Sequence, residues 1–173
     1  MNNFKEKLNK IRGFIFDIDG VLSLQTVNLD KSGIPDRTVN IRDGYAIQLA
    51  VKKNYKVAVI SGAMCKEYRK RLNQLGVKDI YLNSAVKINC FRDFLKKSGL
   101  SADEVIYMGD DIPDIEVMKE AGVPVCPADA DNEVRKLAVY ISDKRGGEGC
   151  VRDIIEQVLR LHNKWMNSDT YKW

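Results

Sequence analysis

The chain has 173 residues, of which 45% are hydrophobic and 30% are charged, a balance typical of one soluble globular domain. Its 28 basic and 24 acidic residues are evenly mixed and give a net charge of +4, so the sequence lacks the concentrated basic stripe of a nucleic-acid-binding protein. No run approaches the ~18 apolar residues of a membrane span, and the first ten residues lack a signal-peptide core, so we expect a cytoplasmic protein without nucleic-acid or membrane partners.

Short apolar runs alternate with longer amphipathic segments along the chain. In chain order, we expect a strand at 11–16, a helix at 44–54, a strand at 56–60, a helix at 65–75, a strand at 79–82, a helix at 88–98, a strand at 104–108, a helix at 114–121, a strand at 123–126, a helix at 131–138, a strand at 139–141 and a helix at 151–165. Because the strands read as continuous apolar runs separated by helices, they predict an α/β fold. We expect a three-layer, Rossmann-like arrangement, with a mostly parallel sheet covered by helices on both faces.

Residues 1–173 are expected to form one domain, because no repeat, low-complexity tract or linker interrupts the pattern. Residues 24–40 (LQTVNLDKSGIPDRTVN) depart from the alternation, with β-type residues on both sides of DKSG. This segment predicts a β-hairpin excursion with its turn near Ser32 and Gly33. The C-terminal tail, 166–173, has no strong pattern.

Cysteine and histidine are too few and too scattered for several common kinds of site. The cysteines at 65, 90, 126 and 150 show no Cys-x-x-Cys spacing, and His162 is the only histidine. A zinc site, a disulfide framework and histidine-based nucleophilic catalysis are therefore all unfavourable.

Polar side chains follow four of the predicted strands. Asp17 and Asp19 follow the first strand, Ser61 and Gly62 the second, Lys87 comes shortly after the third, and GDDIPD (109–114) follows the fourth. Because ligands gather at the carboxyl ends of parallel strands, these side chains are candidates for one shared site.

The acidic residues of this set predict a site for a hard divalent cation. Asp17 and Asp19 lie one residue apart, and Asp110, Asp111 and Asp114 add three acids at a neighbouring strand end. Carboxylates this close repel one another unless a cation or a proton lies between them. Oxygen ligands without cysteine or histidine favour Mg²⁺.

The remaining residues of the set suit a phosphate group. Lys87 offers a point charge, and Ser61 with the N–H groups near Gly62 offers hydrogen-bond donors. A divalent cation, a carboxylate nucleophile and phosphate-binding donors together predict phosphoryl transfer.

These residues carry a resemblance to a known family. FDIDGVLS (16–23), ISG (60–62), Lys87 and GDDIPD (109–114) resemble, in the usual order, the four motifs of the haloacid dehalogenase (HAD) superfamily. Further segments resemble its 3-deoxy-D-manno-octulosonate 8-phosphate (KDO 8-phosphate) phosphatase subfamily: VNIRDGYAI (39–47), RLNQLGV (71–77), VPVCPADA (123–130) and GGEGCVRDIIE (146–156). The similarity covers roughly residues 11–160 and implies a HAD fold.

The resemblance implies a role for each acid. Asp17 is expected to be the nucleophile that forms an aspartyl-phosphate, and Asp19 the general acid and base. Mg²⁺ is expected on Asp17, on the main-chain carbonyl of Asp19 and on Asp110. Asp111 and Asp114 are expected to support the cation from outside its ligand set.

The same resemblance implies which residues contact the substrate. Ser61, Gly62 and Lys87 are expected to bind the transferring phosphoryl group. The sugar acid is expected to contact Asn40, Ile41, Arg42, Asp43, Gly44 and Arg71. The implied reaction is hydrolysis of KDO 8-phosphate, a step in the synthesis of lipopolysaccharide precursors.

The spacing between the motifs leaves no room for a cap domain. Only about 40 residues separate Asp19 from Ser61, and Gly109 follows Lys87 by only 22 positions. The resemblance implies that a homotetramer completes the open site. Residues 24–40 would form the assembling hairpin, and either 145–149 or the tail would reach the neighbouring site.

Two positions depart from the KDO 8-phosphate pattern and leave the substrate open. Ala63 and Gln48 stand where that family commonly has arginine. A sister group acts on nine-carbon substrates, namely KDN 9-phosphate and, in sialic acid synthesis, N-acylneuraminate 9-phosphate. Retention of Arg42-Asp43-Gly44 favours the eight-carbon substrate.

Two other classes of protein compete with the phosphatase hypothesis. A phosphoacceptor receiver-like signalling domain also combines acids, a hydroxyl and a lysine on a parallel sheet. Its phosphorylated aspartate follows the acidic pair, whereas here the GDD cluster comes last, so the order argues against a receiver. A silent binding scaffold would lack the nucleophile or acid, yet Asp17, Asp19, Lys87 and Asp110 are all present.

Overall fold

A parallel sheet forms the centre of the computed structural model, which describes residues 4–171. Its strands in this part of the chain are β1 (Gly13–Phe16), β2 (Lys56–Ile60), β3 (Asp79–Tyr81), β4 (Val105–Met108), β5 (Val123–Cys126) and β6 (Tyr140–Ile141). They lie in the order β3-β2-β1-β4-β5-β6, and each neighbouring pair is parallel. The predicted Rossmann-like α/β fold is confirmed.

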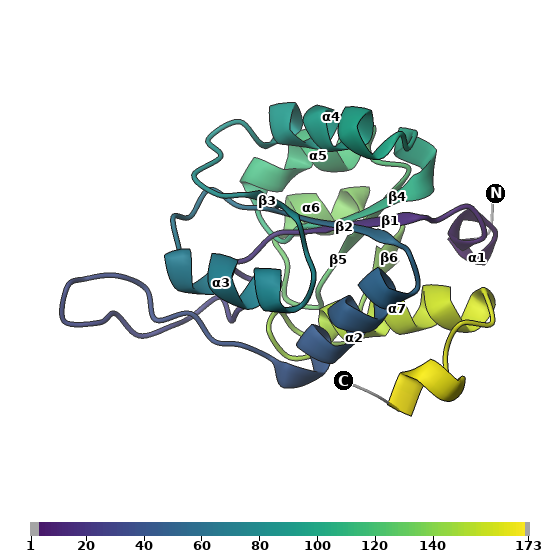
Figure 1. The fold of residues 1–173 in the computed structure, drawn as a ribbon. Helices are drawn as coiled ribbons and strands as arrows, with labels where there is room; N and C mark the ends of the chain where they lie inside the picture. The colour runs from purple at the N-terminus through teal and green to yellow at the C-terminus, as the bar shows by residue number, and fades with distance from the viewer. Residues whose placement is uncertain (1–3, 172–173) are drawn as a thin grey trace.

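Helices cover both faces of this sheet (Figure 1). They are α1 (Phe4–Leu8), α2 (Ile41–Lys52), α3 (Lys66–Gln74), α4 (Lys87–Ser98), α5 (Ile115–Glu120), α6 (Asn132–Leu137) and α7 (Cys150–Leu161). One hydrophobic cluster packs α1, α2, α3 and α7 on one face, and a second packs α4, α5 and α6 on the other. The result is the three-layer arrangement that the sequence predicts.

The central strand, β1, shows why the sheet is buried on both sides. Its four residues, GFIF, are all buried, because successive side chains of a strand point to opposite faces. Phe14 and Phe16 join the cluster that contains α2 and α7, whereas Ile15 joins the cluster that contains α4 and α5. A strand covered on both faces has no polar position, so the first carboxylates appear only where β1 ends.

The strand order places a crevice between β1 and β4. From β1 the chain runs outward to β2 and β3 and then returns to β4 on the other side of β1. The helices that follow neighbouring strands diverge at such a reversal, and ligands of doubly wound sheets bind there, beyond the carboxyl ends of the strands. Asp17 and Asp110 both lie just past this point.

The segment 24–40 projects from the body of the molecule as a long loop (Figure 1). Its turn forms as predicted: Asp30 Oδ1 accepts hydrogen bonds from the backbone N–H groups of Ser32 and Ile34 at 2.7 and 2.9 Å, and Gly33 has a φ of +77°. The predicted hairpin is present in a minimal form. An antiparallel bridge joins Leu29 to Pro35, and hydrogen bonds flank it on both sides: the N–H of Asp30 donates to the carbonyl of Ile34, and the N–H of Asp36 donates to the carbonyl of Asn28, each at 2.8 Å.

Element ends differ from the prediction where a cap decides them. Helix α2 begins at Ile41 rather than at residue 44, because the side chain of Asn40 caps it. Helix α7 ends at Leu161 rather than at residue 165. None of the helices in the described range has the length and hydropathy needed to cross a bilayer.

The described part of the tail docks on its own chain. It contains a short 3₁₀ helix, Ser168–Tyr171, and the hydroxyl of Tyr45 donates a hydrogen bond to the carbonyl of Thr170. Lys53 Nζ donates to Asn167 Oδ1 at 2.9 Å. These contacts hold the described tail against α2, and residues 172–173 lie outside the described part.

Candidate active site

An open cleft of about 830 Å³ lies at the carboxyl ends of β1, β2 and β4. The lining includes all of the residues that the sequence assigns to the catalytic, phosphate and metal sites: Asp17, Asp19, Ser61, Gly62, Lys87, Asp110, Asp111 and Asp114. The convergence expected from four separate strand ends is therefore what the fold produces. Between Asp19 and Gly109, the described residues form no additional domain over this cleft.

Asp17 lies at the floor of the cleft, directly after β1. It is only 6% exposed. Its Oδ1 accepts a hydrogen bond from the N–H of Ile18 at 2.6 Å, and its Oδ2 accepts one from Lys87 Nζ at 2.7 Å. Burial, and next the charge of Asp114, raise the pKa of Asp17 to about 6 despite these donors.

Asp17, Asp110 and Asp114 form a buried acidic cluster. One carboxylate oxygen from each lies within 4.8 Å of the others. Burial, followed by the charges of Asp17 and Asp114, raises the pKa of Asp110 to about 8. Asp110 Oδ1 is buried and has no hydrogen-bond partner among the described residues.

The charges of this cluster do not balance without a cation. Among the described residues, Lys87 pairs with Asp17 and Asp114, and the third carboxylate, Asp110, has an oxygen without a hydrogen-bond partner. A hard divalent cation would restore neutrality and satisfy that oxygen. The cluster is therefore a fitting site for the divalent cation that the sequence predicts.

Asp114 is fully buried and holds Lys87 in place. Its Oδ1 accepts hydrogen bonds from Lys87 Nζ at 2.8 Å and from the hydroxyl of Tyr107 at 2.5 Å. Its Oδ2 accepts one from the N–H of Asp110 at 3.1 Å. Burial alone would lower the pKa of Lys87, but the charges of Asp17 and Asp114 outweigh it and raise that pKa. Both oxygens of Asp114 are thus occupied, which fits the supporting role predicted for it.

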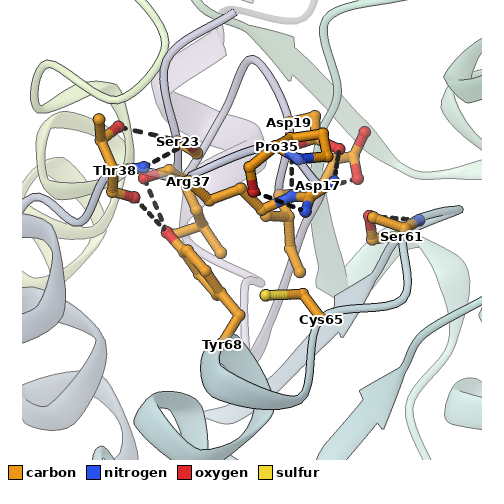
Figure 2. A network of polar contacts seen from close by, with 12 residues as sticks. Asp17, Asp19, Ser23, Pro35, Arg37, Thr38, Ser61, Cys65 and Tyr68 are labelled. Carbon is orange, nitrogen blue, oxygen red and sulfur yellow. Dashed lines mark hydrogen bonds and ion pairs between the residues drawn. The ribbon is translucent and has the colours of Figure 1, made fainter. Parts of the chain in front are cut away.

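Asp19 points in another direction and pairs with Arg37. Its side chain is 49% exposed, and Arg37 donates to both of its oxygens, from Nε to Oδ1 at 2.7 Å and from Nη2 to Oδ2 at 2.9 Å. Figure 2 shows these two side chains meeting beside Asp17. This ion pair also raises the pKa of Arg37.

Arg37 was not predicted as a site residue, because it belongs to the projecting loop. The base of that loop is closed by Ser23 and Thr38: the N–H of Thr38 donates to Ser23 Oγ at 3.0 Å, and the hydroxyl of Tyr68 donates to the carbonyl of Thr38 at 3.2 Å (Figure 2). Because these hydrogen bonds hold the end of the loop beside its beginning, Arg37 lies in the lining of the cleft. The only signal in the sequence is an arginine beside a proline and an aspartate.

Ser61 and Gly62 form the turn after β2. Ser61 is buried, its N–H donates to the carbonyl of Tyr81, and its Oγ accepts from the N–H of Ala63 at 3.2 Å. Gly62 is exposed to the cleft. Ala63 also lines the cleft, so the side chain that replaces the family arginine faces the site.

Gln25 is another site residue that the sequence did not reveal. Its Nε2 donates to Asp110 Oδ2 at 3.2 Å and to the carbonyl of Asp129 at 3.0 Å.

Gly20 packs even closer to the acidic cluster. It has a φ of +75°, and a Cβ added to it would lie 1.9 Å from Asp110 Oδ2, so only glycine fits.

Asp111 lies at the exposed rim of the cleft, just before the short 3₁₀ helix Ile112–Asp114, and its N–H donates to Asp114 Oδ2 at 3.4 Å. This position is outside the buried cluster and leaves a supporting role open to it.

The six residues predicted to contact the sugar acid do not line this cleft in the single chain. Asn40 caps α2, Asp43 is buried and accepts from the N–H of Arg152 at 2.7 Å, and Gly44 packs beside Arg71. Ile41 and Arg42 are exposed along a separate groove between α2 and α7. The structure assigns capping and packing to several of these residues, and their contact with substrate stays a prediction.

Comparison with known proteins gives concordant matches. Residues 77–154 match a family model described as haloacid dehalogenase-like hydrolase. The chain is 35% identical over 158 residues to the 3-deoxy-D-manno-octulosonate 8-phosphate phosphatase KdsC of Salmonella typhi, covering 91% of this chain and 84% of that protein.

Solved structures agree with the sequence matches. The crystal structure of 3-deoxy-D-manno-octulosonate 8-phosphate phosphatase from Yersinia pestis has a TM-score of 0.90 at 30% identity, covering 94% of this chain and 88% of that chain. The enzyme of the same name from Moraxella catarrhalis, solved with magnesium ion, phosphate ion and KDO, has a TM-score of 0.89 at 28% identity, covering 95% of each chain.

A doubly wound parallel sheet with a buried aspartate cluster at its switch point, matched by these relatives, defines a haloacid dehalogenase-like hydrolase without a cap domain. Within that class, the chain belongs to the 3-deoxy-D-manno-octulosonate 8-phosphate phosphatase family. It is accordingly a phosphoric monoester hydrolase.

Proposed function

We propose that this chain hydrolyses KDO 8-phosphate to KDO and phosphate with Mg²⁺, through an aspartyl-phosphate on Asp17. The observation that carries the proposal is the cluster of Asp17, Asp110 and Asp114 beside Lys87, in which one oxygen of Asp110 has no hydrogen-bond partner in the described part of the chain. The relatives named for this reaction support the substrate. With that substrate, the enzyme would serve lipopolysaccharide precursor synthesis.

The residues present suit Mg²⁺. Asp17, Asp110 and the main-chain carbonyl of Asp19 would hold it, while Asp114 would stay with Lys87 and Tyr107. When bound, the cation neutralises charge on the transferring phosphoryl group. Ser61, the N–H groups near Gly62 and Lys87 would orient the oxygens of that group.

Two displacements at phosphorus account for the reaction. The carboxylate of Asp17 attacks phosphorus, the bond between phosphorus and the sugar oxygen breaks, and the departing oxygen takes its electron pair and a proton from Asp19. Water then attacks the acyl-phosphate at phosphorus and gives its proton to Asp19. Phosphate leaves, and Asp17 and Asp19 return to their starting states.

Arg37 provides a link between substrate binding and Asp19. The leaving sugar is an acid, and the planar fork of an arginine fits a carboxylate with two hydrogen bonds. In the free protein Asp19 occupies that fork. We infer that the substrate carboxylate competes for Arg37 and so frees Asp19 to transfer protons.

The open cleft favours assembly as a homotetramer. The projecting loop exposes Leu29 and Ile34, with 66% and 53% of their surfaces accessible, and a neighbouring subunit would cover these apolar side chains. Light scattering should give about four times the chain mass of 19.6 kDa. A clean monomer would contradict this assembly. The cytoplasmic location stays a prediction.

A substrate panel tests the function. Phosphate release should be measured from KDO 8-phosphate, KDN 9-phosphate and N-acylneuraminate 9-phosphate, each with Mg²⁺ and with EDTA. We expect Mg²⁺-dependent turnover with the highest kcat/KM on KDO 8-phosphate. A preference for a nine-carbon ester would favour the alternative to which Ala63 and Gln48 point. Equal, feeble rates on every ester would reject a dedicated sugar-acid phosphatase.

A signalling role is tested in the same preparation. Incubation with acetyl phosphate should not leave a long-lived phosphoprotein, because water must reach the acyl-phosphate on Asp17. A stable phosphoprotein that releases no phosphate would favour the receiver-like alternative instead.

A further inference from the structure

The loop 145–149 packs against the turn that follows the nucleophile. The N–H of Gly147 donates to the carbonyl of Val21 at 2.8 Å. A Cβ added to Gly146 would lie 1.9 Å from the carbonyl oxygen of Gly20, so the two backbones are in direct contact. A displacement of this loop would therefore displace the backbone of Gly20 as well.

Gly20 transmits that contact to the acidic cluster. It lies between Asp19, whose carbonyl is a proposed metal ligand, and the side chain of Asp110, which a Cβ on Gly20 would strike. The N–H of Gly146 also donates to Asp129 Oδ1 at 2.9 Å, and the carbonyl of Asp129 accepts from Gln25, which reaches Asp110. Two short chains of contacts thus join the loop to the proposed metal site.

Asn40 holds the same loop from outside the cleft. Its Oδ1 accepts the N–H groups of Arg42 and Asp43 at 2.9 and 3.2 Å, which caps α2. Its Nδ2 donates to the carbonyl of Gly147 at 3.0 Å. One amide side chain therefore caps a helix with its oxygen and fastens the loop with its nitrogen.

Asp43 fixes the other end of the loop. It is almost fully buried, and its Oδ1 accepts the N–H of Arg152 in the first turn of α7, which follows the loop directly. The start of α2 and the start of α7 are joined in this way, with the loop 145–149 between them. The loop 145–149 is thus fixed at its C-terminal end by Asp43, and the hydrogen bond from Asn40 to Gly147 fixes its middle.

We propose that Asn40 is a positioning residue, which holds the loop 145–149 against the turn at Gly20 and thereby places the backbone of Asp19 and the side chain of Asp110 for the reaction. The inference rests on the proposed function and differs from the substrate contact that family resemblance implies for Asn40. In this structure Asn40 does not line the cleft, and its polar atoms are directed to the backbone.

Two substitutions separate the two roles of Asn40. Asn40→Ser and Asn40→Asp both keep an oxygen that caps α2, because serine and aspartate are as good caps as asparagine. Serine is too short to reach the carbonyl of Gly147, and an aspartate carboxylate cannot donate to it. Agreement between the neutral and the charged variant excludes an effect of charge. Asn73→Asp, an exposed position on α3, adds the same charge away from the cleft.

Amide hydrogen exchange tests the clamp without reference to activity. In both Asn40 variants we expect faster exchange in 145–149, where Gly147 donates to Val21, with unchanged protection in the middle of α2. Asn73→Asp should exchange as the wild type does. Unchanged exchange in 145–149 in both Asn40 variants overturns the proposal.

Steady-state kinetics with para-nitrophenyl phosphate tests the consequence, because this ester has no sugar acid. We expect kcat to fall about tenfold or more in both variants with KM within about twofold, since small displacements of reacting groups cost large factors in rate. A raised KM on KDO 8-phosphate with unchanged kcat on both esters would overturn the proposal in favour of substrate contact. If the wild type hydrolyses no ester, the proposed function fails, and hydrogen exchange still decides whether the clamp exists.

Discussion

Arg37 and Asp19 form a two-point ion pair across the mouth of the cleft, with N–O distances of 2.7 and 2.9 Å. The arginine comes from the projecting loop, and the aspartate is the expected general acid and base. The side chain of Arg37 is largely shielded, whereas that of Asp19 is half exposed. The pair therefore joins the loop to the chemistry, and it places a guanidinium where a substrate carboxylate would arrive.

Replacement of Arg37 should separate sugar-acid recognition from phosphoryl transfer. In Arg37→Ala we expect KM for KDO 8-phosphate to rise about 10- to 100-fold, because a charged hydrogen bond contributes about 1.5–3 kcal/mol. The factor follows because every 1.4 kcal/mol corresponds to a tenfold change in an equilibrium constant. Turnover of para-nitrophenyl phosphate should change less than about threefold, since that ester carries no carboxylate. The measurement is a pair of Michaelis curves for each protein.

The conservative variant sharpens this result. Arg37→Lys keeps the charge but loses the fork, so it should show an intermediate KM on the sugar acid. An equal loss on both esters would show that Arg37 acts only through Asp19, and would contradict recognition of the carboxylate.

Replacement of the nucleophile should abolish turnover while the fold persists. Asp17→Asn removes one negative charge from a cluster in which Asp110 and Asp114 already repel it, and Lys87 keeps its bond to Asp114. We expect a loss of kcat on the order of 1,000-fold or more, with a native circular dichroism spectrum. Phosphate release under single-turnover conditions measures it. Near-normal activity would remove Asp17 as the nucleophile.

The sequence was sufficient to predict the sheet, because each strand is a continuous apolar run. The strand predicted at 123–126 has the same bounds as β5. The strand predicted at 11–16 differs from β1 only in its first two residues. The hairpin predicted within 24–40 is present but short, with one antiparallel bridge between Leu29 and Pro35. An isolated two-stranded hairpin is only marginally stable, and among the described residues this segment pairs with no strand of the central sheet.

The site was predictable where the topology alone decides position. Asp17 and Ser61 directly follow strands and Asp110 comes two positions after the end of β4, so a parallel sheet must bring them to one edge. Arg37 and Gln25 were missed because they depend on how an irregular loop folds back. Tyr107 was also missed, although a tyrosine inside an otherwise apolar buried strand needs a hydrogen-bond partner, and that need was a usable signal.

Stability without metal should fall as the pH rises. Burial and neighbouring acids raise the folded pKa of Asp17 to about 6 and of Asp110 to about 8, from an ordinary value of 3.8. The folded protein then binds protons that the unfolded chain has released, so the stabilisation is complete below pH 3.8 and is lost as the pH rises through about 6 and about 8. Thermal unfolding in EDTA from pH 5 to 8.5 measures this loss.

Magnesium should reverse that trend, because it binds the ionised carboxylates. The increase in Tm on adding Mg²⁺ should grow between about pH 6 and pH 8, the interval that Asp110 controls. Burial also raises the pKa of Asp43 to about 6, and this residue is not among the proposed metal ligands. The part of the stability that Asp43 loses as the pH rises to about 6 should therefore be lost in the presence of the metal as well. Asp110→Asn should remove the Mg²⁺ effect. A Mg²⁺-induced shift that is equal at every pH would contradict this assignment.

Tyr107→Phe should weaken the support of Lys87 without changing the shape of the core. The substitution removes one donor from Asp114, at 2.5 Å, while Lys87 and the N–H of Asp110 continue to bind it. A hydrogen bond to a charged group contributes about 1.5–3 kcal/mol, so urea unfolding should show a loss of that size. We expect kcat to fall as well, because a less firmly held Asp114 fixes Lys87, and through it Asp17, less tightly. Tyr140→Phe is the matched control, since its hydroxyl donates to Asp153 at 2.8 Å away from the cleft. That variant should keep full turnover, and an equal loss of kcat in both variants would show that the effect of Tyr107 is only a general loss of stability.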